Sequence, residues 1–214
     1  MDATPIVERF LAKDDLSGLG LVISTAYKGC AMFCRNHWVT SYFPVGMEQR
    51  AHLLRAFVDH GLMRFADERE DFTHEIRPNN ARNCHHVRIF KNQLAITAHF
   101  MGRKKFRRYA RVARNREFLA ERNTADLFGY EDKFLDVFND TGYAQILHGG
   151  SADRPEFLKL VIPTRDQASI AAHMPLAIPE PDVVVAELIR EEITLKVKNF
   201  KSEEDEGPDA EATG

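Results

Sequence analysis

Apolar residues recur at three- and four-residue spacing over the first third of the chain, a pattern typical of helices with one buried face. The pattern predicts a short helix from Thr4, a long helix over about 18–39 and a third helix over about 47–60. Two glycines near the start of the long helix leave a strand at 20–25 as an alternative there. The N-terminal part of the chain, about 1–66, is therefore expected to be helical.

The period of the pattern changes after a polar stretch at 67–83, which we interpret as a turn or loop around Pro78. Residues 85–90 and 94–101 alternate and are rich in β-branched and aromatic side chains, which predicts a β-hairpin. Three further strands are predicted over 143–148, 157–162 and 169–174. Residues 182–198 carry both strand and helix signals, so their structure is left open.

Helices followed by hairpin-linked strands favour an α+β fold with a mainly antiparallel sheet. We expect one domain over 1–199, with its sheet-containing part at about 84–199, and a tail at 200–214. A basic amphipathic helix is expected to be inserted between strands of the sheet. The strict strand–helix alternation of a doubly wound fold is missing.

Composition adds few constraints. The chain has 214 residues, 44% of them hydrophobic and 29% charged, close to the values for globular proteins. No uninterrupted apolar run approaches the length of a membrane span, and the first residues lack the basic and apolar regions of a signal peptide. Three cysteines fit reduced thiols. Together these features predict a cytoplasmic protein without membrane contact.

The most unusual feature is the basic segment, defined as residues 103–116, which holds eight bases and no acid. On a helix over about 103–122, one half of the wheel is apolar and the other carries most of the charge. Like charges three or four residues apart destabilise a helix, so an anion is expected to lie against this face. The residues expected to contact it are Arg103, Lys104, Arg107, Arg108, Arg111 and Arg114.

Nucleic acid is the first candidate for that anion, because arginine forks match phosphate oxygens. An acidic protein surface is the second candidate, and a solvated face without any partner is the third. The sequence has no zinc-finger spacing and no aromatic signature of an RNA-recognition motif, so sequence-specific readout has no positive support.

The C-terminal residues 201–214 carry six acids and one base. They lack aromatic residues and offer almost nothing apolar to bury, which predicts a disordered acidic tail. Such a tail either keeps the protein soluble or competes with nucleic acid for the basic segment.

Cys30, Cys34 and His37 share one face of the long predicted helix, and Cys84, His85 and His86 are candidates to complete a zinc site. Core packing of the helix cysteines is the favoured alternative, because the same face carries large apolar residues. We therefore expect no metal and no other cofactor.

Four histidines fall on predicted strands and are the candidate catalytic groups of an enzyme: His86, His99, His148 and His173. Arg88 and Glu192 are possible additions to such a site. The chain has no serine-hydrolase elbow, phosphate-binding loop or dinucleotide fingerprint. A hydrolase acting on nucleic acid or a phosphoester is the remaining enzyme class.

Two hypotheses for the function follow. The first is a non-enzymatic regulatory protein, accessory or antitoxin-like in size and charge, that binds nucleic acid or an acidic partner through the basic segment. The second is a nuclease or phosphoesterase that uses the strand histidines. The two differ in whether those histidines converge in one cleft with a carboxylate.

Overall fold

A computed structural model describes residues 2–37, 40, 44–78, 85–102, 142–151, 153–163 and 170–205. Within these ranges, the side chains of Val45, Met47 and residues 195–205 are not described. The basic segment and the helix expected over 103–122 lie outside the described residues. So do the last nine residues of the acidic tail.

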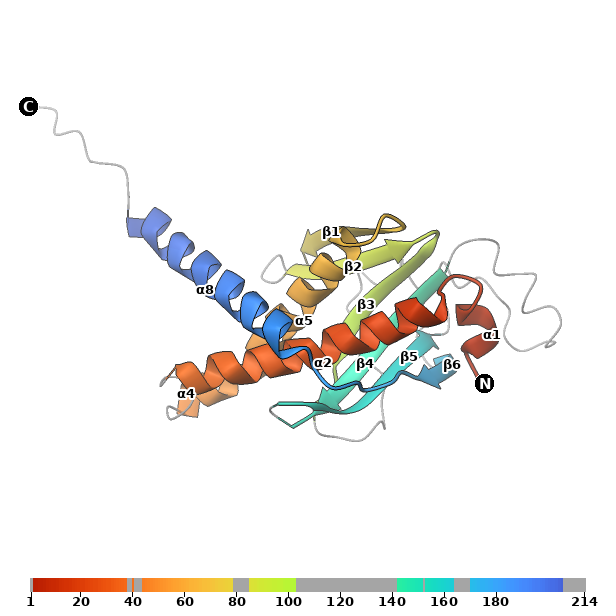
Figure 1. The fold of residues 1–214 in the computed structure, drawn as a ribbon, viewed down its shortest axis with the longest axis horizontal. Coiled ribbons are helices and arrows are strands. Elements are labelled where there is room, and N and C mark those ends of the chain that lie inside the picture. The colour runs from red at the N-terminus through yellow and green to blue at the C-terminus, as the bar shows by residue number, and fades with distance from the viewer. Residues whose placement is uncertain are drawn as a thin grey trace, which may run out of the picture.

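Helices form the N-terminal part of the fold, as predicted, and one more helix ends the described chain (Figure 1). The long helix begins earlier than expected, because the carboxylate of Asp15 accepts a hydrogen bond of 2.7 Å from the backbone N–H of Ala12 and thereby closes the first turn. The strand alternative at 20–25 is wrong. The helices are α1 (Thr4–Val7), α2 (Lys13–Asn36), α4 (Pro44–Glu48), α5 (Arg50–Asp67) and α8 (Val183–Asp205).

Six strands form one sheet in the order of the sequence. β3 and β4 pair in parallel, and every other neighbouring pair is antiparallel. The sheet confirms the mainly antiparallel α+β fold and the hairpin formed by the second and third strands. The strands are β1 (Phe72–Pro78), β2 (His85–Lys91), β3 (Leu94–Phe100), β4 (Gly142–Gly150), β5 (Pro155–Pro163) and β6 (Ile170–Pro175).

One stretch differs from the sequence prediction, and the structure decides another that was left open. The polar stretch 67–83 contains β1, an edge strand that buries Phe72 but leaves Ile76 half exposed. Its polar residues are tolerated because an edge strand meets solvent on one side. The ambiguous stretch 182–198 is helical, and α8 continues to Asp205, six residues into the tail that we expected to be disordered.

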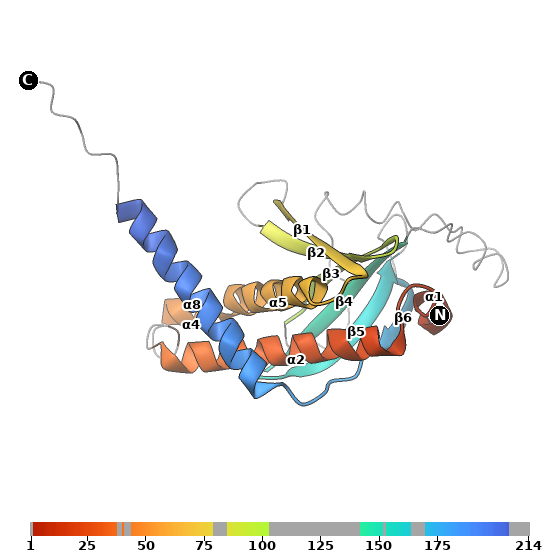
Figure 2. The ribbon, with the colours of Figure 1, turned by 45° about the horizontal axis from the view of Figure 1, so that its top comes forward.

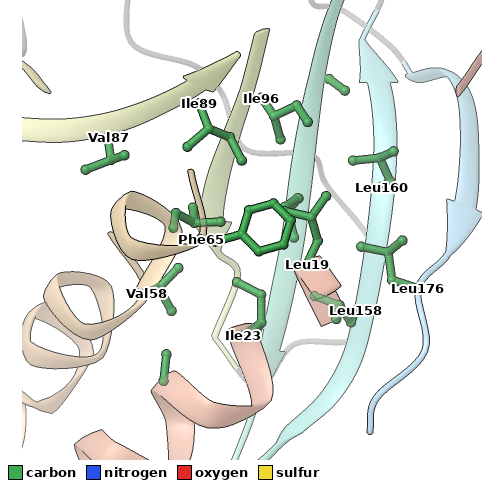
Figure 3. Packing of buried hydrophobic residues seen from close by; sticks show 14 of the residues in the cluster. Leu19, Ile23, Val58, Phe65, Val87, Ile89, Ile96, Leu158, Leu160 and Leu176 are labelled. Carbon is green, nitrogen blue, oxygen red and sulfur yellow. The ribbon is translucent and has the colours of Figure 1, made fainter. Parts of the chain in front are cut away.

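The helices and the sheet form two layers, with α2 and α5 side by side on one face of the sheet (Figure 2). α8 crosses α2 and its far end extends beyond the sheet (Figure 1). The core lies between the two layers. Leu19 and Ile23 of α2 meet Phe65 of α5 and strand residues such as Ile96 and Leu160 (Figure 3). Burial of these side chains is the main favourable term in folding.

Helix α2 is also long and apolar enough to cross a membrane by length and composition alone. In the fold, 61% of its apolar window is buried, and the core helix of a soluble protein meets the same criterion. The structure therefore leaves the predicted location of the protein undecided.

Candidate functional site

The four candidate catalytic histidines do not converge. His148 faces the helices, where its Nδ1 lies 3.1 Å from the hydroxyl oxygen of Tyr27. His86 on β2 and His99 on β3 alternate with the strand residues that pack against the helices, so both face the opposite side of the sheet. His173 lies on the edge strand β6. Among the described residues, the four histidines therefore do not gather in one place, although His86 and His99 share a face of the sheet.

His148 is unsuited to acid–base chemistry at neutral pH. Its side chain is completely buried, and burial lowers its pKa to about 3. Burial also raises the pKa of Tyr27 above its ordinary value. Both groups are therefore neutral at physiological pH, and their contact joins helix α2 to strand β4 as a structural hydrogen bond.

The two possible additions to the catalytic site lie in separate places. Arg88 donates to the carboxylate of Glu75 at 3.1 Å and to Nε2 of His86 at 3.2 Å, on β1 and β2. Glu192 lies on α8, where its carboxylate is 2.6 Å from Nε2 of His60 on α5. Each carboxylate thus pairs with a neighbouring base, and Glu192 fixes α8 against α5.

A buried polar network occupies the sheet face turned away from the helices. The hydroxyl of Thr97 lies 2.8 Å from Nε2 of His99 and 2.9 Å from the hydroxyl of Tyr143. Gln145 donates its amide to the same Tyr143 oxygen at 3.2 Å. Within the described residues, no donor reaches the amide oxygen of Gln145. These hydrogen bonds link side chains of β3 and β4 on this face of the sheet.

The candidate metal ligands are only partly together. Cys30 and Cys34 lie one turn apart on α2, and both are buried, with 3% and 4% of their surface exposed. The ring of His37 packs against Phe33 instead, with 4.2 Å between ring centres. No group of three or more metal-ligating side chains occurs among the described residues. Cys84 lies outside them.

The two cysteines nevertheless line a pocket of about 620 Å³ at one end of the molecule. α2 contributes both thiols and Arg35, and α5 contributes Arg50 and Leu54. The ends of β3 and β4 complete the lining with Phe100, Gly102, Gly150 and Ser151, together with Asp153 just beyond. The chain passes from Gly102 directly into the basic segment.

Arg50 is held beside the cysteines by a hydrogen bond of 2.9 Å from its Nε to the backbone oxygen of Thr40. The hydroxyl of Thr40 in turn donates to the backbone oxygens of Cys34 and His37. These bonds tie the end of α2 to the beginning of α5. They also fix a guanidinium next to a pair of thiols.

Sequence reasoning treated the cysteines as core residues and missed the pocket. No local signal points to it, because its walls come from α2, α5 and the ends of two strands that are distant in the sequence. The one sequence feature that marks this end of the molecule is the basic segment that begins after Gly102.

No protein-family model matches the chain, and neither the curated proteins nor the solved structures include a match to it.

Proposed function

We propose that the protein is a non-enzymatic regulatory protein that binds a polyanion, and in the first place nucleic acid, through the basic segment. The observation that carries this proposal is the run of eight bases without an acid. Six of the eight are arginines, whose planar forks match phosphate oxygens better than ammonium groups do.

The position of the segment in the chain supports the proposal. The segment begins directly after Gly102, next to a pocket that also presents Arg35 and Arg50. In the sequence, the segment follows β3, which is a central strand of the sheet.

The ion pairs of the described part point in the same direction. Buried and half-buried carboxylates are already engaged by bases of that part: Asp15 by Lys91, Glu75 by Arg88 and Glu192 by His60. These three carboxylates are therefore not available to neutralise the basic segment.

The test is binding of labelled duplex DNA and RNA to a charge-reversed variant, R107E/R111E/R114E, at low salt. Loss of binding is expected while the circular dichroism spectrum and the melting temperature stay close to wild type. The matched control is R9E/K13E/R154E, which makes the same change in net charge at bases outside the segment. A triple variant that binds as well as wild type, or a control that loses binding equally, contradicts the proposal.

An acidic protein surface is the alternative partner. The result that would favour it is a wild-type protein that binds no nucleic acid but is retained on a polyglutamate column, together with an R107E/R111E/R114E variant that is not retained. An acidic protein surface would then replace nucleic acid as the proposed partner.

A further inference from the structure

The pocket beside Cys30 and Cys34 has the features of a site for a small molecule. Its volume of about 620 Å³ falls within the range of ligand pockets. Exposed residues, Glu48 and Asp153, form part of its lining, so it opens to solvent. The two thiols lie on one helical face and contribute to the same wall.

The contacts of the two thiols make them unequal. A hydrogen bond from the thiol of Cys30 lowers the pKa of Cys34. Burial opposes this change and the charge of Arg50 reinforces it, so that the pKa of Cys34 is about 7. The same contact and burial raise the pKa of Cys30 above its ordinary value. The contact with Cys30 and the charge of Arg50 therefore favour a thiolate on Cys34.

The surroundings of Cys34 are typical of a reactive cysteine rather than of an inert core residue. A thiolate is the nucleophile in cysteine chemistry, and a neighbouring thiol and a guanidinium stabilise it. A thiol whose pKa lies near the ambient pH is also the best placed to attack a disulfide. Core packing explains the burial of Cys34 but not the pocket in front of it or the arginine fixed beside it.

We propose that Cys34 is a nucleophilic thiol that forms a mixed disulfide with an anionic low-molecular-weight disulfide entering this pocket. The Cys34 thiolate attacks one sulfur of the reagent, and a new sulfur–sulfur bond forms as the reagent's own bond breaks. The second half of the reagent leaves as a thiolate and takes a proton from water. No other oxidant is needed, because the reagent is reduced as Cys34 is oxidised.

The charges of the lining favour an anionic reagent. Arg50 is anchored to Thr40 and adjoins Cys34, while Arg35 interacts only weakly with Asp153, at 3.8 Å. Glu48 is the other acid of the lining, and it is exposed on the short helix α4. The guanidinium beside Cys34 therefore attracts a carboxylate-bearing disulfide toward the reacting sulfur.

The test uses the full-length native protein at pH 7 with glutathione disulfide, which is anionic, and with cystamine, which is cationic, and each rate is divided by the rate of the same reagent with the urea-unfolded protein. Intact mass and peptide mapping measure the rate and the position of the adduct. We expect an adduct on Cys34 that forms faster with glutathione disulfide. C34S abolishes it, and C84S, which removes the third cysteine, retains it.

Arg50→Gln tests the role of the guanidinium. It is expected to slow the reaction with glutathione disulfide about threefold to fivefold at pH 7, and to change it less at pH 9, where ionisation of the Cys34 thiol depends less on the guanidinium. Circular dichroism establishes that C34S and R50Q remain folded.

Three results would overturn the proposal. The first is an adduct that maps to Cys84 or that forms on C34S at the wild-type rate. The second is a native protein that does not react while the urea-unfolded protein does. The third is faster reaction with cystamine than with glutathione disulfide. The proposal does not rest on nucleic-acid binding, and none of these readouts depends on it.

Discussion

The hydroxyl oxygen of Tyr27 lies 3.1 Å from Nδ1 of His148, in a completely buried contact between helix α2 and strand β4. The two rings meet edge to face, with 5.7 Å between their centres. Because burial lowers the pKa of His148 to about 3, the imidazole is neutral in the folded protein.

This burial makes the stability of the fold depend on pH. Between the ordinary histidine pKa of about 6.5 and the folded value, the unfolded chain binds a proton that the folded chain does not. The stabilisation is therefore complete above about pH 6.5 and is lost as the pH falls, by up to about 1.4 kcal/mol per pH unit. Urea unfolding of wild type and His148→Gln at pH 7.5, 6 and 5 measures the effect. Parallel pH profiles for the two proteins would refute it.

A second prediction concerns the carboxylate of Asp15, which is almost completely buried at the start of α2. It lies 2.6 Å from Nζ of Lys91, which also contacts Asp71, and it accepts the backbone N–H of Ala12. Burial disfavours the charge of Lys91, but its hydrogen bonds to Asp15 and Asp71 outweigh this effect and raise its pKa.

Asp15→Ala removes the main partner of a mostly buried ammonium group and is expected to cost about 3–5 kcal/mol of unfolding free energy. Asp14→Ala is the matched control, because Asp14 is exposed on the same turn, and it should cost less than about 1 kcal/mol. Equal losses in chemical denaturation would show that the ion pair adds nothing beyond the charge near the helix start.

Gly20 provides a third prediction, for the packing of α2 against the segment before α8. A Cβ atom at Gly20 would lie 2.5 Å from the backbone oxygen of Ala177. Gly20→Ala must therefore displace main chain and is expected to destabilise the fold by about 1–3 kcal/mol, although alanine is the better helix former. Ser17→Ala, at an exposed position of the same helix, should change little. A G20A protein as stable as wild type would mean that the close approach does not hold in solution.

The acidic tail gives a fourth prediction, which rests on the proposed function. Truncation after Asp205 leaves α8 intact and removes Glu206, Asp209 and Glu211. If these acids compete for the basic segment, the truncated protein should bind DNA about threefold more tightly at low salt, with the difference vanishing at high salt. E206Q/D209N/E211Q should behave in the same way. Unchanged affinity in both proteins would leave the tail a solubilising segment.

The sequence predicted much of the fold because the signals were local. Alternation in 85–90 and 94–101 identified the hairpin, and the spacing of apolar residues identified the helices that became α2 and α5. β1 was not predicted, because an edge strand tolerates polar residues such as His74, Glu75 and Arg77, and in the sequence these residues are typical of a loop. The start of α8 was ambiguous because three consecutive valines favour a strand. Two of these valines are exposed, and the carboxylate of Asp182 caps a helix there by accepting the backbone N–H of Val185.

The candidate sites depended on non-local geometry. A shift of one residue turns a strand histidine to the other face, and this is why His148 and His99 lie on opposite sides of the sheet. The pocket at Cys34 needs Arg50 and the ends of β3 and β4, and no spacing rule brings these together. The basic segment was visible in the sequence alone, and its role stays a prediction.

The most direct test of the central claim is fluorescence anisotropy of labelled duplex DNA with the full-length protein across a salt titration. About five phosphate contacts through the basic segment predict a log–log slope of about −4 to −5 for the wild-type protein. R107E/R111E/R114E removes three of these contacts and should show little binding. Absence of wild-type binding even at low salt, or affinity that does not change with salt, would contradict a nucleic-acid-binding role for the segment.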